Sequence, residues 1–101
     1  MDLVSGMESA GDEYEVERVL KRGSRLLDKL IQGYGREGAE KFVKVLMKTL
    51  RDGKERKARI SGKKVRFRPV AGGILVITGS GVTFLTGEDV YSVVATIRET
   101  S

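Results

Sequence analysis

The first half of the chain carries apolar residues at helical spacing in two consecutive segments. The first segment begins at Asp12, a residue suited to a helix N-cap, and ends at Gly33 or Gly35. The second covers residues 36–52 and stops at Gly53. The apolar positions are Val16, Val19, Leu20, Leu27, Leu30, Ile31 and Tyr34 in the first segment and Ala39, Phe42, Val43, Leu46 and Leu50 in the second.

The two predicted helices are separated by only a few residues, and such a short connection favours antiparallel packing. Gly23 lies on the apolar stripe of the first helix, where the absence of a side chain lets another backbone approach closely. We therefore expect a helical hairpin whose two helices touch near Gly23.

After Gly53 the apolar spacing changes from helical to alternating. The strands are expected at 57–60, 64–68, 74–78 and 82–86, with turns at Ser61-Gly62 or Gly62-Lys63, at Gly72-Gly73 and at 79–81. The segment 74–78, ILVIT, is a continuous apolar run suited to a central strand. Pro69 indicates that the second strand ends there or lies at a sheet edge. This pattern predicts four antiparallel strands.

The chain ends in a third predicted helix, which runs to about Glu99. Thr86 is suited to be its cap, and Asp89, three residues on, completes an arrangement like a capping box. The order of elements predicts an α+β fold with an N-terminal helical hairpin, a four-stranded antiparallel sheet and a C-terminal helix, packed as two layers with the helices over one sheet face. With 101 residues, we expect a single domain over 12–101 after a flexible acidic tail over 1–11.

The composition makes catalysis a poor hypothesis. The chain has no cysteine and no histidine, which removes the commonest general base, the thiolate nucleophile and the commonest transition-metal ligands. We expect no enzymatic activity, no cofactor and no metal.

No signal peptide or membrane span is evident, so we expect a cytoplasmic protein. The chain has no asparagine and only one glutamine, Gln32, a bias associated with hyperthermophiles.

The net charge of +5 is unevenly distributed. Residues 21–68 carry 17 basic and five acidic side chains, whereas the segments on either side of them are acidic. Basic residues recur at helical spacing on both predicted helices and alternate with apolar residues in the first hairpin. We expect some of these faces, the hairpin with one or other helical stripe, to converge on a shared groove or rim. Its candidate nucleic-acid-binding residues are Arg22, Arg25, Lys41, Lys44, Lys48, Arg59, Lys63, Lys64, Arg66 and Arg68, together with Tyr34 and Tyr91 as residues on which bases stack.

The aromatic residues divide by their phase within each element. Phe42, Phe67 and Phe84 fall on apolar phases and are expected in the core, whereas Tyr34 and Tyr91 are expected to be partly exposed. The cations of the second strand are expected to share a face with neighbouring Ile74, Val76 or Leu85. Bases would then lie on the aliphatic part while the charged rim holds the phosphates.

The order of elements, the basic hairpin 63-KKVRFRPV-70, the following 74-ILVITGSGVTFLTGEDVYSVV-94 and the amide-poor composition resemble one family. It is the ThermoDBP-related single-stranded-DNA-binding proteins of hyperthermophilic archaea. The resemblance covers about residues 12–99. It implies binding of single-stranded DNA with little sequence preference, no enzymatic activity and assembly into homo-oligomers, dimers or tetramers. The founding members carry a C-terminal leucine zipper that this chain does not show, so oligomers are expected to use the domain itself, through Val45 and Met47 or through the strand that ends at Pro69.

The leading hypothesis is a non-enzymatic module that binds single-stranded nucleic acid, DNA before RNA, by neutralising phosphates and stacking bases. RNA remains an alternative ligand. A second alternative, from another class, is a small interaction subunit whose basic face docks an acidic protein partner.

Overall fold

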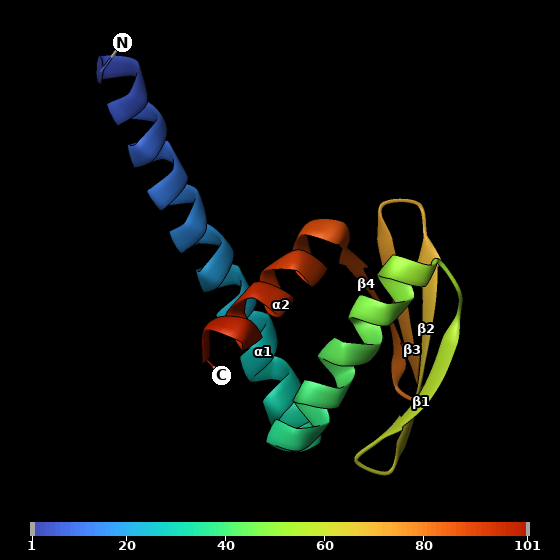
Figure 1. Cartoon of the computed structure of the whole chain (residues 1–101). Helices are drawn as coiled ribbons and strands as arrows, with labels where there is room; N and C mark the ends of the chain where they lie inside the picture. The colour runs from blue at the N-terminus through green and yellow to red at the C-terminus, as the bar shows by residue number, and fades with distance from the viewer. Residues whose placement is uncertain (1, 101) are drawn as a thin grey trace.

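The elements follow one another in the order that the sequence pattern predicts. In the computed structural model, which describes the backbone of residues 2–100 and the side chains of residues 17–99, α1 spans Asp2–Asp52. The remaining elements are β1 (Arg56–Ile60), β2 (Lys63–Val70), β3 (Gly73–Thr78), β4 (Gly81–Thr86) and α2 (Gly87–Thr100). The predicted α+β fold, with helices on one side of a four-stranded antiparallel sheet, is confirmed (Figure 1).

Gly35 divides α1 into two arms. Its φ of 78° and ψ of 172° are not helical, and the positive φ is a conformation that glycine adopts without steric cost. We call residues 2–34 the first arm and residues 36–52 the second arm. The second arm ends at Gly53, whose φ is 65° and whose N–H donates to the carbonyl of Thr49 at 2.9 Å. The predicted break and stop are therefore confirmed.

The start of α1 differs from the prediction. The helix begins at Asp2 instead of Asp12, so the expected N-cap lies within helical backbone, where each N–H already has a carbonyl partner one turn earlier. The flexible tail expected over residues 1–11 stays a prediction, because the side chains there lie outside the described residues.

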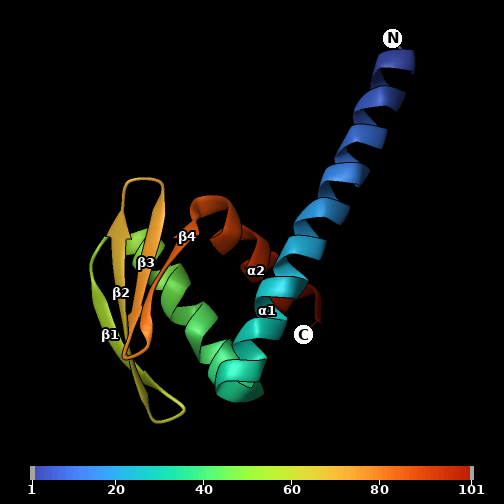
Figure 2. The same ribbon diagram turned by 180° about the vertical axis from the view of Figure 1, so that it is seen from behind.

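The partner of Gly23 also differs from the prediction. The two arms diverge as a V, and α2 lies between them (Figures 1 and 2). A Cβ at Gly23 would collide with Thr96 Oγ1 and the Ser92 carbonyl, both in α2. The Thr96 hydroxyl donates to that carbonyl at 2.9 Å and lies 3.4 Å from the carbonyl oxygen of Leu20. Gly23 therefore serves the crossing of the first arm with α2, which is a contact between residues far apart in the sequence.

The sheet is an antiparallel meander in which each strand pairs with the next, so β2 and β3 are central and β1 and β4 are the edges. The β1–β2 turn is Ser61-Gly62, with φ values of 53° and 79°, as in a type I′ turn. Of the two alternatives for the strand of Pro69, the edge position is wrong, whereas the strand does end close to Pro69, at Val70. Pro69 is tolerated in a central strand because β1 begins at Arg56, opposite Phe67, so no strand is present on the side toward which the missing N–H would point.

The helices bury one face of the sheet, which we call the inner face. Ile60, Val65, Phe67, Ile74 and Val76 lie in the core with side chains of the second arm and α2. The Phe42 and Phe67 rings meet edge to face, with centroids 5.0 Å apart. The prediction that these two phenylalanines are core residues is confirmed.

The start of α2 has the cap that the sequence predicts. The Thr86 N–H donates to Asp89 Oδ2, and the Asp89 N–H donates to Thr86 Oγ1, both at 3.0 Å. Glu88 and Asp89 therefore lie in the first turn of the helix, where acidic groups are favoured. Within the described residues, no helix has a stretch that is both long and apolar enough to cross a membrane.

Candidate nucleic-acid interface

The face of the sheet that points away from the helices carries five of the seven cations of β1 and β2. We call it the outer face. Because side chains alternate across a strand and the register fixes which residues are neighbours, its members follow directly from the pairing. They are Lys57 and Arg59 in β1; Lys64, Arg66, Arg68 and Val70 in β2; Gly73, Leu75 and Ile77 in β3; and Val82, Phe84 and Thr86 in β4.

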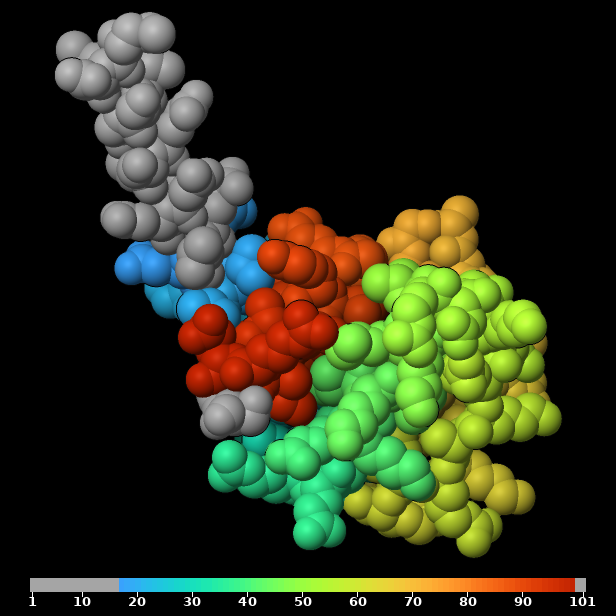
Figure 3. Space-filling model, in the orientation of Figure 1, coloured from blue at the N-terminus to red at the C-terminus, as the bar shows by residue number. Residues whose placement is uncertain are grey.

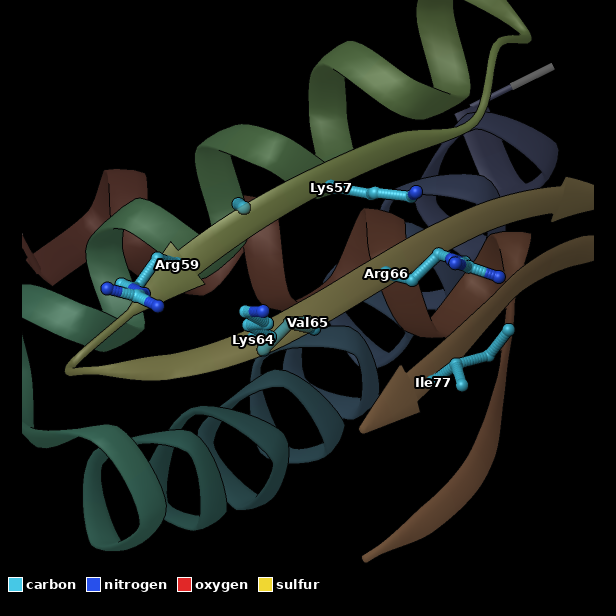
Figure 4. A pocket seen from close by; sticks show the side chains of 7 residues that line it. Lys57, Arg59, Lys64, Val65, Arg66 and Ile77 are labelled. Atoms are coloured by element: carbon cyan, nitrogen blue, oxygen red, sulfur yellow. The ribbon is translucent and has the colours of Figure 1, made fainter. Parts of the chain in front are cut away.

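The outer face changes character from one edge to the other. One row across the sheet reads Lys57, Arg66, Ile77 and Val82, and the next reads Arg68, Leu75 and Phe84. Figure 4 shows the side chains of Lys57, Arg66 and Ile77 side by side across three strands. The face is therefore basic over β1 and β2 and apolar over β3 and β4.

A shallow hollow of about 620 Å³ lies over β1 and β2 and reaches the apolar half at Ile77. Its lining residues are Lys57, Ala58, Arg59, Lys64, Val65, Arg66 and Ile77 (Figure 4). Four of these seven residues are cations and none is acidic. The hollow can therefore receive a negatively charged group that lies beside an apolar one.

Two pairs of like charges face each other directly across β1 and β2. Lys57 is the register partner of Arg66, and Arg59 is the register partner of Lys64. Like charges at directly opposite positions destabilise a sheet. None of these four side chains forms an ion pair with a carboxylate among the described residues. This repulsion costs folding free energy, and a bound anion would relieve it.

Arg68 differs from the other cations of the outer face because it has an acidic partner. Its Nε lies 2.7 Å from Glu55 Oε1, just before β1. The hydrogen bond from Arg68, aided by the charges of Arg68, Arg66 and Lys57, lowers the pKa of the Glu55 carboxyl. Glu55 therefore stays ionised and partly neutralises this corner of the face.

The apolar half of the outer face is unusually exposed. Val82 is 62% and Phe84 is 47% exposed, while Leu75 and Ile77 are half-buried. The prediction that Phe84 is a core residue is wrong, because its position in β4 pairs it with Leu75 on the face that no helix covers. The prediction that the cations share a face with Ile74, Val76 or Leu85 is wrong by one residue, since these three point to the inner face. The continuous apolar run of β3 gave no alternation from which the phase could be read.

The predicted lysines at the sheet edge bind backbone carbonyls. Lys63, at the hairpin tip, donates from Nζ to the Gly33 carbonyl at 3.1 Å and lies 5.4 Å from the centroid of the Tyr34 ring. It thus stabilises the carboxyl end of the first arm, where a cation is favoured. Lys41 of the second arm donates to the Arg59 carbonyl at 2.7 Å, so its side chain lies beside the edge strand β1. Lys44 and Lys48 are exposed on the second arm.

The two tyrosines predicted to stack bases lie away from the outer face. Tyr34 is half-buried at the end of the first arm, and its ring centroid is 5.4 Å from that of Phe42. Tyr91 is 65% exposed on α2, in the helical layer. Neither side chain is positioned to contact a strand bound on the outer face.

Arg22 and Arg25 belong to a separate basic surface. The first-arm surface consists of Arg18, Lys21, Arg22, Arg25 and Lys29, which line a hollow of about 360 Å³ with Leu26 and Asp89. Arg22 pairs there with Glu88 at 2.9 Å and lies 4.0 Å from Asp89. Figure 3 shows the described part of the first arm and the sheet on opposite sides of α2. The structure therefore does not bring the first-arm stripe into one groove with the hairpin, whereas Lys41 of the second-arm stripe lies beside β1.

No protein-family model matches the chain, and neither a curated protein nor a solved structure matches it. Over the described residues, no cluster of three or more acidic side chains could hold a metal ion. The outer face is therefore the feature of the described structure from which a function can be argued.

Proposed function

We propose that this protein binds single-stranded DNA, without enzymatic activity and with little sequence preference, on the outer face of its sheet. The observation that carries this proposal is the pair of like-charged contacts, Lys57 with Arg66 and Arg59 with Lys64, directly beside an exposed apolar surface. Selection for stability alone disfavours like charges at directly opposite positions of a sheet. A ligand that supplies both anions and apolar faces accounts for the two halves together.

Nucleic acid has these two properties in one molecule. Its phosphates take up the cations, and the release of counterions makes binding strong at low salt. Its unstacked bases bury their faces against aliphatic and aromatic side chains, which every base can do. Single strands are favoured over a duplex, because paired bases inside a duplex keep their faces stacked on one another and leave the apolar half of the outer face uncovered. DNA is the ligand that the sequence resemblance implies.

The test is fluorescence anisotropy with a labelled oligonucleotide of about 20 to 30 nucleotides at several salt concentrations. The logarithm of the affinity is expected to fall with that of the salt concentration, with a slope of about −0.7 per phosphate contacted. Replacing Arg59, Lys64 and Arg66 together by Ala should reduce the slope by about two and weaken binding across all sequences. The melting temperature should stay the same or rise, since like charges are removed.

The matched control is the replacement of Lys21, Arg25 and Lys29 by Ala, which removes the same charge from the first-arm surface. This variant should bind nearly as well as the wild-type protein. Equal losses in the two variants would show that only net charge matters, and absence of binding at about 50 mM salt would contradict the proposal. If RNA of the same sequence binds more tightly than DNA, the outer face is still the binding site but the preferred ligand is RNA.

A further inference from the structure

We infer, on the basis of the proposed function, that the bound strand lies parallel to the β-strands, with its phosphates over β1 and β2 and its bases over β3 and β4. Phe84 is then the residue on which a base stacks. The inference thus adds a binding mode to the proposed function. It also assigns a contact to Phe84, which the sequence pattern predicted to be a core residue.

The direction of the strand follows from the spacing of the cations. Lys64, Arg66 and Arg68 succeed one another along β2 at steps of two residues, or about 6.5 Å. This step is similar to the separation between neighbouring phosphates along a nucleic-acid strand. A nucleic-acid backbone that runs along β2 would thus place one phosphate at each cation. A nucleic-acid backbone that crosses the sheet would contact cations on β1 and β2 only and would then lie on the apolar side chains of β3 and β4.

The side on which the bases lie follows from the change of character across the sheet. From Arg66 the next neighbours in the row are Ile77 and Val82, and from Arg68 they are Leu75 and Phe84. Because the bases of a single strand can all extend to one side of its backbone, phosphates over β2 place the bases over β3 and β4. The opposite placement would set bases on four like-charged side chains and phosphates on apolar ones.

Phe84 offers the flat surface that a base needs. Phe84 is 47% exposed, and Gly72 in the turn beside it has no side chain that could cover the ring: a Cβ there would stand 4.0 Å from Phe84 Cζ. The other aromatic side chains that the structure describes, Tyr34, Phe42, Phe67 and Tyr91, lie in the core or in the helical layer. Phe84 is therefore the one described aromatic residue on the outer face.

This binding mode limits the specificity for bases and the number of nucleotides that one chain covers. The apolar half presents no hydrogen-bonding side chain to a base except Thr86 at its end, so it accepts any base. The three cations of β2 match about three phosphates, so each chain covers a short segment. Arg68 exchanges its carboxylate partner, Glu55, for a phosphate when the strand binds.

The experiment compares the wild-type protein and Phe84→Ala on two oligonucleotides of equal length, one of thymidines and one of abasic deoxyribose phosphates. On the thymidine oligonucleotide, Phe84→Ala should bind about 5- to 150-fold more weakly, the range for loss of one stacked base. On the abasic oligonucleotide the two proteins should bind alike. Tyr91→Ala, which also removes an exposed aromatic ring, is the matched control and should change neither affinity. Circular dichroism confirms that each variant is folded.

The outcomes separate this inference from the proposed function. If the wild-type protein binds neither oligonucleotide, the proposed function falls, and this inference falls with it. If the wild-type protein binds the thymidine oligonucleotide and Phe84→Ala binds it equally well, or loses the same factor on both ligands, the protein binds single strands but the placement of the bases is wrong.

The direction of the strand is tested with tetrathymidylates that carry one neutral methylphosphonate linkage at each of the three positions in turn, with binding followed by NMR titration. A strand along β2 predicts that the loss caused by Arg66→Ala disappears with the middle linkage, and that those of Lys64→Ala and Arg68→Ala disappear with the two flanking linkages. If all three losses disappear with one and the same linkage, the strand crosses the sheet and the inference is overturned.

Discussion

At the scale of single residues, the neighbours of each charge decide what that charge can do. Arg22 and Arg56 form ion pairs with acids, while Lys41 and Lys63 donate to carbonyls. These four cations are used by the fold. Four other cations face one another as like-charged pairs, Lys57 with Arg66 and Arg59 with Lys64. These four charges are available to a ligand.

Lys57→Glu tests whether the outer face trades stability for binding. The change replaces a like-charged pair with Arg66 by an opposite-charged one, so the free energy of unfolding should rise by about 0.2–1 kcal/mol, measured by urea denaturation. The affinity for single-stranded DNA should fall in the same variant. Lys57→Gln removes the repulsion without adding attraction and should give a smaller gain. A stability below that of the wild-type protein would show that the attraction between Lys57 and the Glu55 carboxylate outweighs the repulsion between Lys57 and Arg66.

Glu55→Gln tests the role of the one acid at the outer face. At neutral pH the variant should bind DNA more tightly with nearly the same salt slope, because Arg68 contacts a phosphate in both proteins but no longer has to break its ion pair with Glu55 first. The ion pair lowers the pKa of Glu55 in the folded protein below the usual 4.5, so its stabilisation is present above that pH and is lost as the pH falls through the lowered pKa. The difference in unfolding free energy between the two proteins should therefore shrink below about pH 4.5. Glu37→Gln, at an exposed position in the second arm, is the control and should not affect DNA binding.

At the scale of elements, local signals located nearly every boundary. Gly35, Gly53, the Ser61-Gly62 turn and the Thr86 cap all lie where the sequence predicts, because each satisfies backbone groups close by in the chain. Apart from the start of α1, which lies at Asp2 instead of Asp12, errors arose where an element meets a distant partner. Gly23 does allow a close approach of another backbone, as predicted, but the neighbour is α2 and not the second arm.

Gly23→Ala should destabilise the crossing of the first arm with α2. The added methyl group would collide with Thr96 Oγ1 and with the Ser92 carbonyl, which is backbone and cannot rotate away. A loss of about 1–3 kcal/mol in the free energy of unfolding is expected from overpacking of this kind. Gly33→Ala is the matched control, since a Cβ there meets no atom within 4 Å and should be neutral or stabilising by up to about 1 kcal/mol. Equal effects of the two changes would argue against a tight crossing.

At the scale of the whole molecule, the packing separates surfaces that the sequence placed together. The second arm and α2 cover the inner face of the sheet, which leaves the outer face open. The same packing sends the first-arm surface to the far side of α2. Since β2 is central, oligomers would have to use something other than its edge, and homo-oligomerisation stays a prediction.

The sequence by itself determined the type, order and approximate limits of the elements, the antiparallel meander and the basic character of the hairpin. These properties depend on periodicity, turn chemistry and capping, which act over a few residues. Only the tertiary structure decided that Phe84 is exposed, that Lys63 binds the end of the first arm, and that the cations adjoin Leu75 and Ile77 instead of Ile74 and Val76. Those facts depend on which side of each strand the helices cover, and that choice is made by contacts between residues far apart in the chain.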